Sequence, residues 1–357
     1  MIVRYAYQYL GVLAVVMPLT TSPVVAQQWE DISAPLFNQT ASLDTSDDVF
    51  NRGIGGILVI PETGELLVVT NGINGLFTSS DQGESWKEVA GAKLSGRSYG
   101  GFGINYDYER GRYVIFMIAR GSEQSATSLI YSGTSQGFIR FKEPTDVQHD
   151  AWTWGMPDWT KDSIQVILGK QHHAWVKLWL SKDAGQSWEL LDFESRNPGV
   201  INDSIFVAGN DDGMYRTTDQ GKSWTKINQW QVTGKNPVKY SSNFYWTTTE
   251  GLIRSTDLGK TWDLHGRALK DALWGPYFGQ DQNHILLVNR DGFYITNSGG
   301  KTWKKVAEFF IIPDSNRNGE YNVMHPTNSY GWDWQNQIIY AAGLGGRIYR
   351  LRLQNRQ

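Results

Sequence analysis

Short runs in which apolar and polar residues alternate recur along most of the chain, and Gly, Asn and Asp separate them. Examples are the segments 75–79, 213–217, 251–255 and 292–296. A period of about two residues is typical of strands with one buried face, whereas a helix would repeat every 3.6 residues. Helix-period segments are scarce after the N-terminal region, and 38 Gly residues supply many turns. The pattern predicts an all-β chain of many short strands.

A motif of eight residues follows these segments and reads [ST]-x-D-x-G-x-[ST]-W. Full copies span 79–86, 181–188, 217–224 and 255–262, and a fifth copy at 296–303 carries Ser298 in place of the aspartate. The last four tryptophans stand at positions 188, 224, 262 and 303, so their spacings are 36, 38 and 41 residues. A nearly constant period of this size indicates a repeat architecture.

The residue types in this motif suit the turn of a β-hairpin, because a second strand-like run follows each tryptophan, as in 86–89 and 303–306. The aspartate carboxylate accepts hydrogen bonds from turn amides, and glycine adopts the positive φ that a tight turn needs. The Ser and Thr hydroxyls tie the turn further, and the indole fills space between neighbouring sheets. We therefore interpret the motif residues as structural.

These residues resemble the Asp-box, also called the BNR repeat, of sialidases, sortilin-type receptor domains, xyloglucanases and a photosystem II assembly factor. The resemblance implies a β-propeller fold over most of the mature chain. In this family the boxes lie on the outer, bottom side of the blades, away from the active face. The resemblance therefore implies a fold and a structural role for the boxes, and no particular function.

One strand of the type that precedes a box is expected in each blade. The box of the second such segment is degenerate (132–137), and the seventh segment ends without a box. Residues 29–32 look like an outer strand without a blade, and pairing them with the last segment would close the ring and leave no open edge. We predict one domain over 27–357, a seven-bladed β-propeller closed by pairing of the N- and C-terminal strands. The seven segments are 75–79, 128–132, 177–181, 213–217, 251–255, 292–296 and 346–351.

Residues 1–26 have the composition of a secretory signal peptide: Arg4, an apolar run over 10–19, and small residues at 24–26. The apolar run is too short to span a bilayer, although an uncleaved membrane anchor is the alternative. We expect a secreted or periplasmic monomer with no membrane insertion after cleavage. The chain has no Cys, so disulfides contribute nothing to the fold.

The net charge of −3 and the lack of a basic stripe argue against nucleic acid and anionic membranes as partners. Of 16 Trp residues, six belong to the repeats, and the others include Trp154 and Trp274. Indole faces stack on sugar C–H surfaces as they pack a core, although burial between blades is the commoner role for any one of them. The expected partner is an extracellular polysaccharide or glycoconjugate.

In propellers, the loops that enter the innermost strands and those that join the second strand to the third meet at the top centre, where ligands bind. Several cations on these loops suit a carboxylated or sulfated sugar. Arg52 stands where sialidases place an arginine, but neither the Ile-Pro that follows it there nor an acid/base Asp loop is present. Arg52 is thus a candidate carboxylate ligand or a structural arginine. The predicted substrate-binding residues are Arg52, Arg97, Arg120, Trp154, His172, Lys239, Trp274 and Arg290.

Two chemistries fit the ionisable residues of this face. A lyase would use an imidazole to abstract the C5 proton of a uronic acid, with Tyr as acid and Arg neutralising the carboxylate. A hydrolase would use two carboxylates across the scissile bond. The candidate catalytic residues are His149, Asp150, Asp271, Tyr321 and His325.

Residues 314–319 match the first half of a calcium-binding loop, with Asp314, Asn316 and Asn318 as candidate metal ligands. The twelfth position holds His325 instead of the bidentate Glu of an EF-hand, so a complete EF-hand is excluded. A loop stiffened by calcium and a plain Asn/Asp/Gly turn both remain open. No cofactor is required by the expected chemistry.

The leading hypothesis is a secreted carbohydrate-active propeller, a glycoside hydrolase or a polysaccharide lyase, that acts on an anionic extracellular glycan. The alternative is a non-catalytic propeller that binds a glycan or a protein or assists assembly.

Overall fold

The computed structural model describes residues 28–39, 54–70, 75–89, 97–120, 128–132, 137–141, 152–171, 177–310, 329–342 and 347–353. The predicted signal peptide (1–26) and the calcium-loop residues Asp314, Asn316 and Asn318 lie outside these ranges. In the described part of the chain, no helix has the length and apolar character needed to cross a membrane.

The described ranges contain seven four-stranded antiparallel sheets, which confirms the predicted all-β architecture. In six of them the strands follow one another in chain order. The first three are β2 (Ile54–Val59) to β5 (Lys87–Glu88), β6 (Arg97–Asp107) to β9 (Gly137–Phe141), and β10 (Trp152–Pro157) to β13 (Glu189–Glu194). Between these bounds lie β3 (Leu66–Thr70), β4 (Leu76–Ser79), β7 (Arg112–Arg120), β8 (Ser128–Ser132), β11 (Ile167–Gln171) and β12 (Lys177–Ser181).

The next three sheets follow the same order. They run from β14 (Asn197–Val200) to β17 (Thr225–Asn228), from β18 (Val238–Tyr240) to β21 (Asp263–Leu264), and from β22 (Ala272–Phe278) to β25 (Lys304–Glu308). Their middle strands are β15 (Phe206–Asn210), β16 (Gly213–Thr217), β19 (Asn243–Thr248), β20 (Gly251–Ser255), β23 (Ile285–Asn289) and β24 (Gly292–Thr296).

The remaining sheet joins the two ends of the chain. It contains β26 (Ser329–Asp333), β27 (Ile338–Ala342), β28 (Ile348–Arg352) and, beyond β28, the N-terminal strand β1 (Glu30–Asp31). In this pair Glu30 lies opposite Arg350 and Asp31 opposite Tyr349. A short helix, α1 (Ala34–Phe37), follows β1. The terminal segments therefore pair as the sequence predicts.

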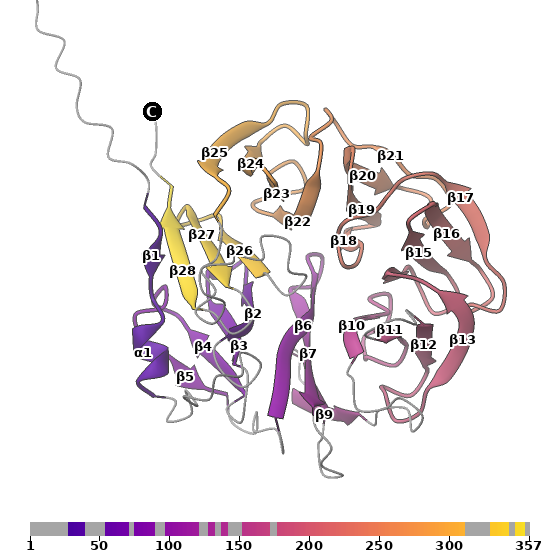
Figure 1. Ribbon diagram of the computed structural model, residues 1–357, viewed down its shortest axis with the longest axis horizontal. Helices are drawn as coiled ribbons and strands as arrows, with labels where there is room; N and C mark the ends of the chain where they lie inside the picture. The colour runs from indigo at the N-terminus through magenta and orange to yellow at the C-terminus, as the bar shows by residue number, and fades with distance from the viewer. Residues whose placement is uncertain are drawn as a thin grey trace, which may run out of the picture.

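The sheets are arranged around a common centre, and strands β2, β6, β10, β18, β22 and β26 lie on the side of their sheets that faces it (Figure 1). Neighbouring sheets bury apolar residues against each other. One such cluster joins Leu286 and Val288 of β23 to Ile339 of β27, and all three are fully buried. Stability thus comes from apolar surface between sheets.

The repeat turns have the hydrogen bonds that their residue types predict. In the first copy, Asp81 Oδ1 accepts a bond from the Ser85 amide at 2.9 Å, and Ser79 Oγ accepts one from the Gly83 amide at 2.9 Å. Gly83 has φ +93°, a conformation that favours glycine. The Ser85 hydroxyl, by donating to the carboxylate, lowers the pKa of Asp81 to about 2. The predicted structural role of these residues agrees with this geometry.

Candidate functional site

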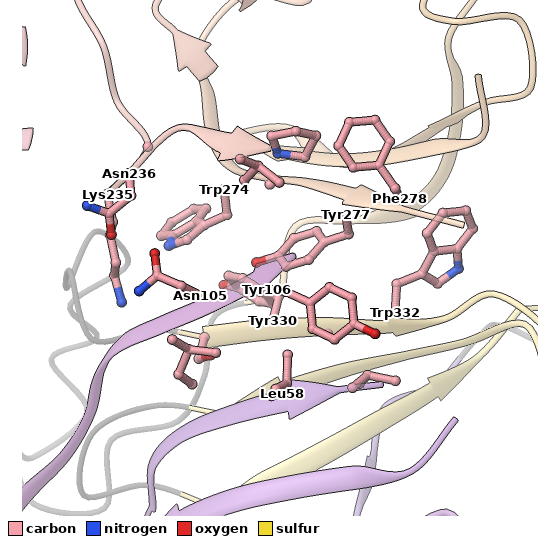
Figure 2. A pocket seen from close by; sticks show the side chains of 18 of the residues that line it. Leu58, Asn105, Tyr106, Lys235, Asn236, Trp274, Tyr277, Phe278, Tyr330 and Trp332 are labelled. Atoms are coloured by element: carbon pink, nitrogen blue, oxygen red, sulfur yellow. The ribbon is translucent and has the colours of Figure 1, made fainter. Parts of the chain in front are cut away.

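A cavity of about 150 Å³ lies at the centre of the molecule (Figure 2). Its described walls come from the inner strands β2, β6, β22 and β26 and from the segment 234–238, which leads into and begins β18. Five segments far apart in sequence therefore meet in one place. A site at the centre of such an arrangement is concave and preformed, which is typical of small-molecule binding sites.

Aromatic side chains form much of the wall. Trp274 and Tyr277 come from β22, and Tyr330 from β26. One face of Trp274 stacks on Phe309 with ring centroids 5.8 Å apart, and its edge meets Tyr330 at 5.1 Å. Burial raises the pKa of the Tyr277 and Tyr330 hydroxyls, so both stay neutral at physiological pH. The wall is apolar in character and its indole is held in place by neighbours.

Two amide side chains supply polar groups, and backbone carbonyls fix their orientation. Asn105 Nδ2 donates to Gly155 O at 2.8 Å, and Asn236 Nδ2 donates to Pro198 O at 2.6 Å. A carbonyl oxygen cannot donate, so the nitrogen of each amide must face it. Each amide oxygen is thereby kept as a hydrogen-bond acceptor.

Lys235 is the cationic side chain in the described lining of the cavity. Figure 2 shows Lys235 among the side chains that line the cavity, together with Asn105 and Trp274. Desolvation by the surrounding protein lowers the pKa of Lys235 to about 8. The ammonium is still mostly protonated at neutral pH, and an anion beside it would raise its pKa again.

The turn between β6 and β7 (residues 108–111) reaches the centre, and its Tyr108 belongs to the cavity lining. The Phe278 amide donates to the Tyr108 hydroxyl at 3.3 Å, and the Tyr108 ring stacks on Tyr240 at 5.9 Å. Glu109 forms an ion pair with Lys239. These contacts join the second sheet to the fifth and sixth, and Figure 1 shows the β6–β7 pair reaching into the middle of the arrangement.

The structure describes the side chains of four predicted site residues: Trp274, Lys239, Asp271 and Arg290. Trp274 lines the cavity. Lys239 does not lie in the loop that enters β18. It lies inside this strand, because β18 begins one residue earlier and is only three residues long. Lys239 is 8% exposed and pairs with Glu109 of the β6–β7 turn. Asp271 and Arg290 are exposed, directly before β22 and after β23, and neither belongs to the described lining.

Three more predicted residues can be assigned to a strand: Arg97 to β6, Arg120 to β7 and Trp154 to β10. Arg97 and Arg120 lie opposite each other in the β6–β7 pair, so both stand at the same end of that pair. The other predicted site residues lie outside the described ranges: Arg52, His149, Asp150, His172, Tyr321 and His325. Among the described residues, no group of three His, Cys, Asp or Glu could hold a metal ion.

The sequence motifs do not single out Lys235, Asn105 or Asn236, which line the cavity. A signal for Asn105 was present, because this polar residue follows Ile104 in an apolar strand and only buried polar partners or a ligand would explain it. Lys235 and Asn236 stand in a Gly-Lys-Asn-Pro segment that reads as a plain turn. Their meeting with β6 depends on the three-dimensional arrangement of the sheets.

No protein-family model matches the chain, and no curated protein matches it. Among solved structures, a GH74 enzyme of Niastella koreensis matches with 14% identity and a TM-score of 0.53, over 85% of this chain and 53% of that one. This chain thus spans about half the length of that enzyme. The β-propeller domain of Cps50 (Swd1) of Myceliophteria thermophila matches with 11% identity and a TM-score of 0.52, over 85% and 97% of the two chains.

A structure titled YCF48 bound to D1 peptide matches over 92% of this chain and 96% of that one, with 12% identity and a TM-score of 0.48. At these identities a likeness shows the fold alone. Together with the four-stranded sheets around a common centre, the likenesses to the GH74 enzyme and to the Swd1 domain show that this chain has a β-propeller fold.

Proposed function

We propose that this protein is a secreted or periplasmic, carbohydrate-active propeller that binds a sugar residue of an anionic extracellular glycan in its central cavity. The observation that carries the proposal is the cavity wall, which combines Trp274 and Tyr277 with the Asn105 amide and the Lys235 ammonium. Aromatic faces pack against sugar C–H surfaces, amides bond to hydroxyls, and an ammonium attracts an anion.

The finer description of the fold is part of the same proposal: a seven-bladed Asp-box propeller closed by its terminal strands. The seven four-stranded sheets of the described ranges and the β1–β28 pair support it. The recurring bonds of the repeat turns, as at Asp81 and Asp219, support the Asp-box assignment.

Catalysis is the further step of this proposal, as a glycoside hydrolase or a polysaccharide lyase. One protein with this fold is a GH74 enzyme, so the fold is compatible with glycan chemistry. The predicted acids and bases His149, Asp150, Tyr321 and His325 would act from segments outside the described ranges. A calcium ion at Asp314, Asn316 and Asn318 would stiffen one such segment, and no other cofactor is needed.

A non-catalytic glycan-binding propeller is the second candidate. The described polar side chains on the cavity wall include two amides and an ammonium, which bind and orient a ligand. The enzyme and the non-catalytic glycan-binding protein would both use the central cavity, so glycan binding is tested first and turnover second.

The test is a panel of uronic-acid, sulfated, sialylated and neutral glycans, with the protein purified as a monomer. Binding is measured by calorimetry, and turnover by reducing ends and by the ultraviolet absorbance of unsaturated uronic products. We expect binding of at least one acidic glycan, and Trp274→Ala should weaken it. The proposal fails if no glycan of the panel binds. New reducing ends without unsaturated products indicate a hydrolase, and unsaturated products indicate a lyase.

A further inference from the structure

The fifth copy of the repeat turn is joined to the neighbouring sheet in a way that two other copies are not. In the copies that end at Trp224 and Trp262, the indole donates to the glycine carbonyl of its own turn at 3.1 Å. In the fifth copy, Trp303 Nε1 donates instead to Arg267 O at 3.0 Å. The glycine carbonyl of this turn, Gly300 O, accepts the Arg267 amide at 2.7 Å. Two hydrogen bonds therefore fix the backbone of Arg267 on the turn.

The residue before Arg267 makes this close approach possible. Gly266 has φ +79°, and a Cβ on it would lie 2.4 Å from the Gly300 carbonyl, so a side chain here would force the backbone to move. Arg267 is exposed, and Lys301, which follows Gly300 in the turn, is exposed too. The backbone contacts thus bring two cationic residues together where the fifth and sixth sheets meet.

A third cation lines a small polar cavity at the same place. The cavity has a volume of about 70 Å³, and its lining includes Arg254 of β20 and His265, which stands two residues before Arg267. The Arg254 guanidinium is half-buried and has no hydrogen bond or ion pair with any other described residue. A half-buried guanidinium without a partner favours an anion that matches its planar fork.

Positive charge exceeds negative charge on the three segments that meet here, which are 254–267, 279–284 and 296–304. The fifth turn itself has no carboxylate, because Ser298 replaces the aspartate. Asp257 and Asp281 are hydrogen-bonded to backbone amides of their own turns, whereas Asp263 lines the small cavity. Five cations outnumber these three carboxylates: Arg254, Lys260, Arg267, Lys301 and Lys304.

We propose that Arg254, Arg267 and Lys301, here called the basic seam, bind anionic groups of an extracellular polysaccharide outside the central cavity. Arg254 receives a carboxylate or sulfate that enters the small cavity, and Arg267 and Lys301 pair with groups further along the chain. A single polymer chain can bring a pendant group to a half-buried guanidinium, whereas a flat membrane surface cannot. This inference rests on the proposed function, because it adds a second contact for the same class of glycan.

The basic seam is tested by calorimetry with polygalacturonic acid and chondroitin sulfate at a series of NaCl concentrations. Arg267→Gln and Lys301→Gln each remove one exposed charge. Lys222→Gln is the matched control, because Lys222 holds the position of Lys301 in a turn that keeps its aspartate, Asp219. We expect each seam variant to weaken binding about twofold to fivefold and the double variant about tenfold, with a smaller salt dependence. The control should bind as the wild type does.

Two further variants change the negative charge of the basic seam. Asp263→Asn removes the carboxylate that lines the cavity with Arg254, and it should strengthen binding. Ser298→Asp restores the carboxylate of the full repeat turn, so it should weaken binding without lowering the melting temperature. Loss of binding in a variant that is at least as stable as the wild type separates recognition of the glycan from folding.

Seam variants that bind both polysaccharides as tightly as the Lys222→Gln control would overturn the inference. The proposed function would then still stand if Trp274→Ala weakens glycan binding, and failure of every glycan overturns the proposed function itself. Vesicles of phosphatidylcholine and phosphatidylglycerol are the second arm. Binding to these vesicles that the seam variants lose, with no effect of the same variants on polysaccharide binding, would assign the seam to a membrane and overturn its assignment to a glycan.

Discussion

Ser298 occupies the position that an aspartate holds in the four full copies of the repeat turn. Its Oγ accepts a hydrogen bond from the Thr302 amide at 3.1 Å and lies 3.1 Å from Thr302 Oγ1. In the copy at 217–224, Asp219 accepts two hydrogen bonds from Ser223. Its Oδ1 accepts one from the Ser223 amide, and its Oδ2 accepts one from the Ser223 hydroxyl at 2.5 Å. The serine keeps the topology of the turn with one neutral oxygen instead of two charged ones.

We therefore predict that Ser298→Asp stabilises the protein by about 0.5–1 kcal/mol, because bonds to a carboxylate are stronger than bonds to a hydroxyl. The melting temperature should rise by roughly 1–3 °C in a calorimetric scan. Asn297→Asp is the matched control, because it adds the same charge at the adjacent exposed position. An equal rise in both variants would mean that net charge, and not the turn, is responsible.

Between elements, the seam that joins the β18–β21 sheet to the β22–β25 sheet is held by the segment after β21. Arg267 N donates to Gly300 O at 2.7 Å, and Trp303 Nε1 donates to Arg267 O at 3.0 Å. His265 lies in this segment with its ring edge-on to Tyr245, and its Nε2 is buried with no hydrogen-bond partner among the described residues. Burial, and next the charge of Arg254, lower the pKa of His265 to about 4.

This seam should weaken in acid. The pKa of the imidazole is 6.5 unperturbed and about 4 in the folded protein, so the unfolded chain takes up the proton first as the pH falls. The contribution of neutral His265 is complete above pH 6.5 and is lost between pH 6.5 and 4. Because the ring is only partly buried, we expect a loss of about 1 kcal/mol.

Melting temperatures of the wild type and of His265→Phe across this pH range measure the effect. His265→Phe should remove this part of the pH dependence, and Arg254→Met should reduce it by raising the pKa of His265. A wild-type slope that survives in His265→Phe would assign the acid sensitivity to other groups.

At the scale of the whole molecule, one guanidinium connects the two ends of the chain with the first repeat turn. Arg350 of β28 donates to both carboxylate oxygens of Glu30 in β1, at 2.7 and 2.9 Å. It also pairs with Glu84 at 2.7 Å and donates to Gln82 O at 3.0 Å. Arg350 is 5% exposed, so these partners are needed to offset the cost of burying its charge.

We expect Arg350→Lys to destabilise the protein by about 1–3 kcal/mol, because an ammonium cannot present the planar fork that holds Glu30. Arg352→Lys is the control, because Arg352 is exposed and donates to the Gln82 side chain. Chemical denaturation of both variants measures the difference. Equal stability of the two variants would show that the Arg350 network adds nothing.

Removing residues 29–32 should have a larger effect. The deletion takes away β1 and the Trp29 ring, which stacks on Phe310 at 4.4 Å, and it leaves β28 as an open edge. We expect aggregation, measured by light scattering during gel filtration. A monomer with the wild-type melting temperature would contradict a stabilising role for this strand.

The sequence predicts those strands that are determined by residues close to them in the chain. Strands β12, β16, β20 and β24 begin and end where the alternating runs do, because each repeat turn defines its own hairpin. The partner of residues 29–32 followed from the need to cover the edge of the last strand. Lys235 and the true position of Lys239 could not be predicted, because both depend on which residues of distant sheets meet at the centre.

The turn at residues 108–111 also has a consequence for folding and for evolution. Glu109 and Lys239 are 130 residues apart in sequence, and their pairing spans the middle of the molecule. In a simple repeat protein each unit touches only its neighbours, so units unfold or are duplicated one at a time. Here the Glu109–Lys239 ion pair links the second sheet to the fifth, so these sheets should unfold together. Inserting or deleting one four-stranded sheet between them would separate the two residues of the pair.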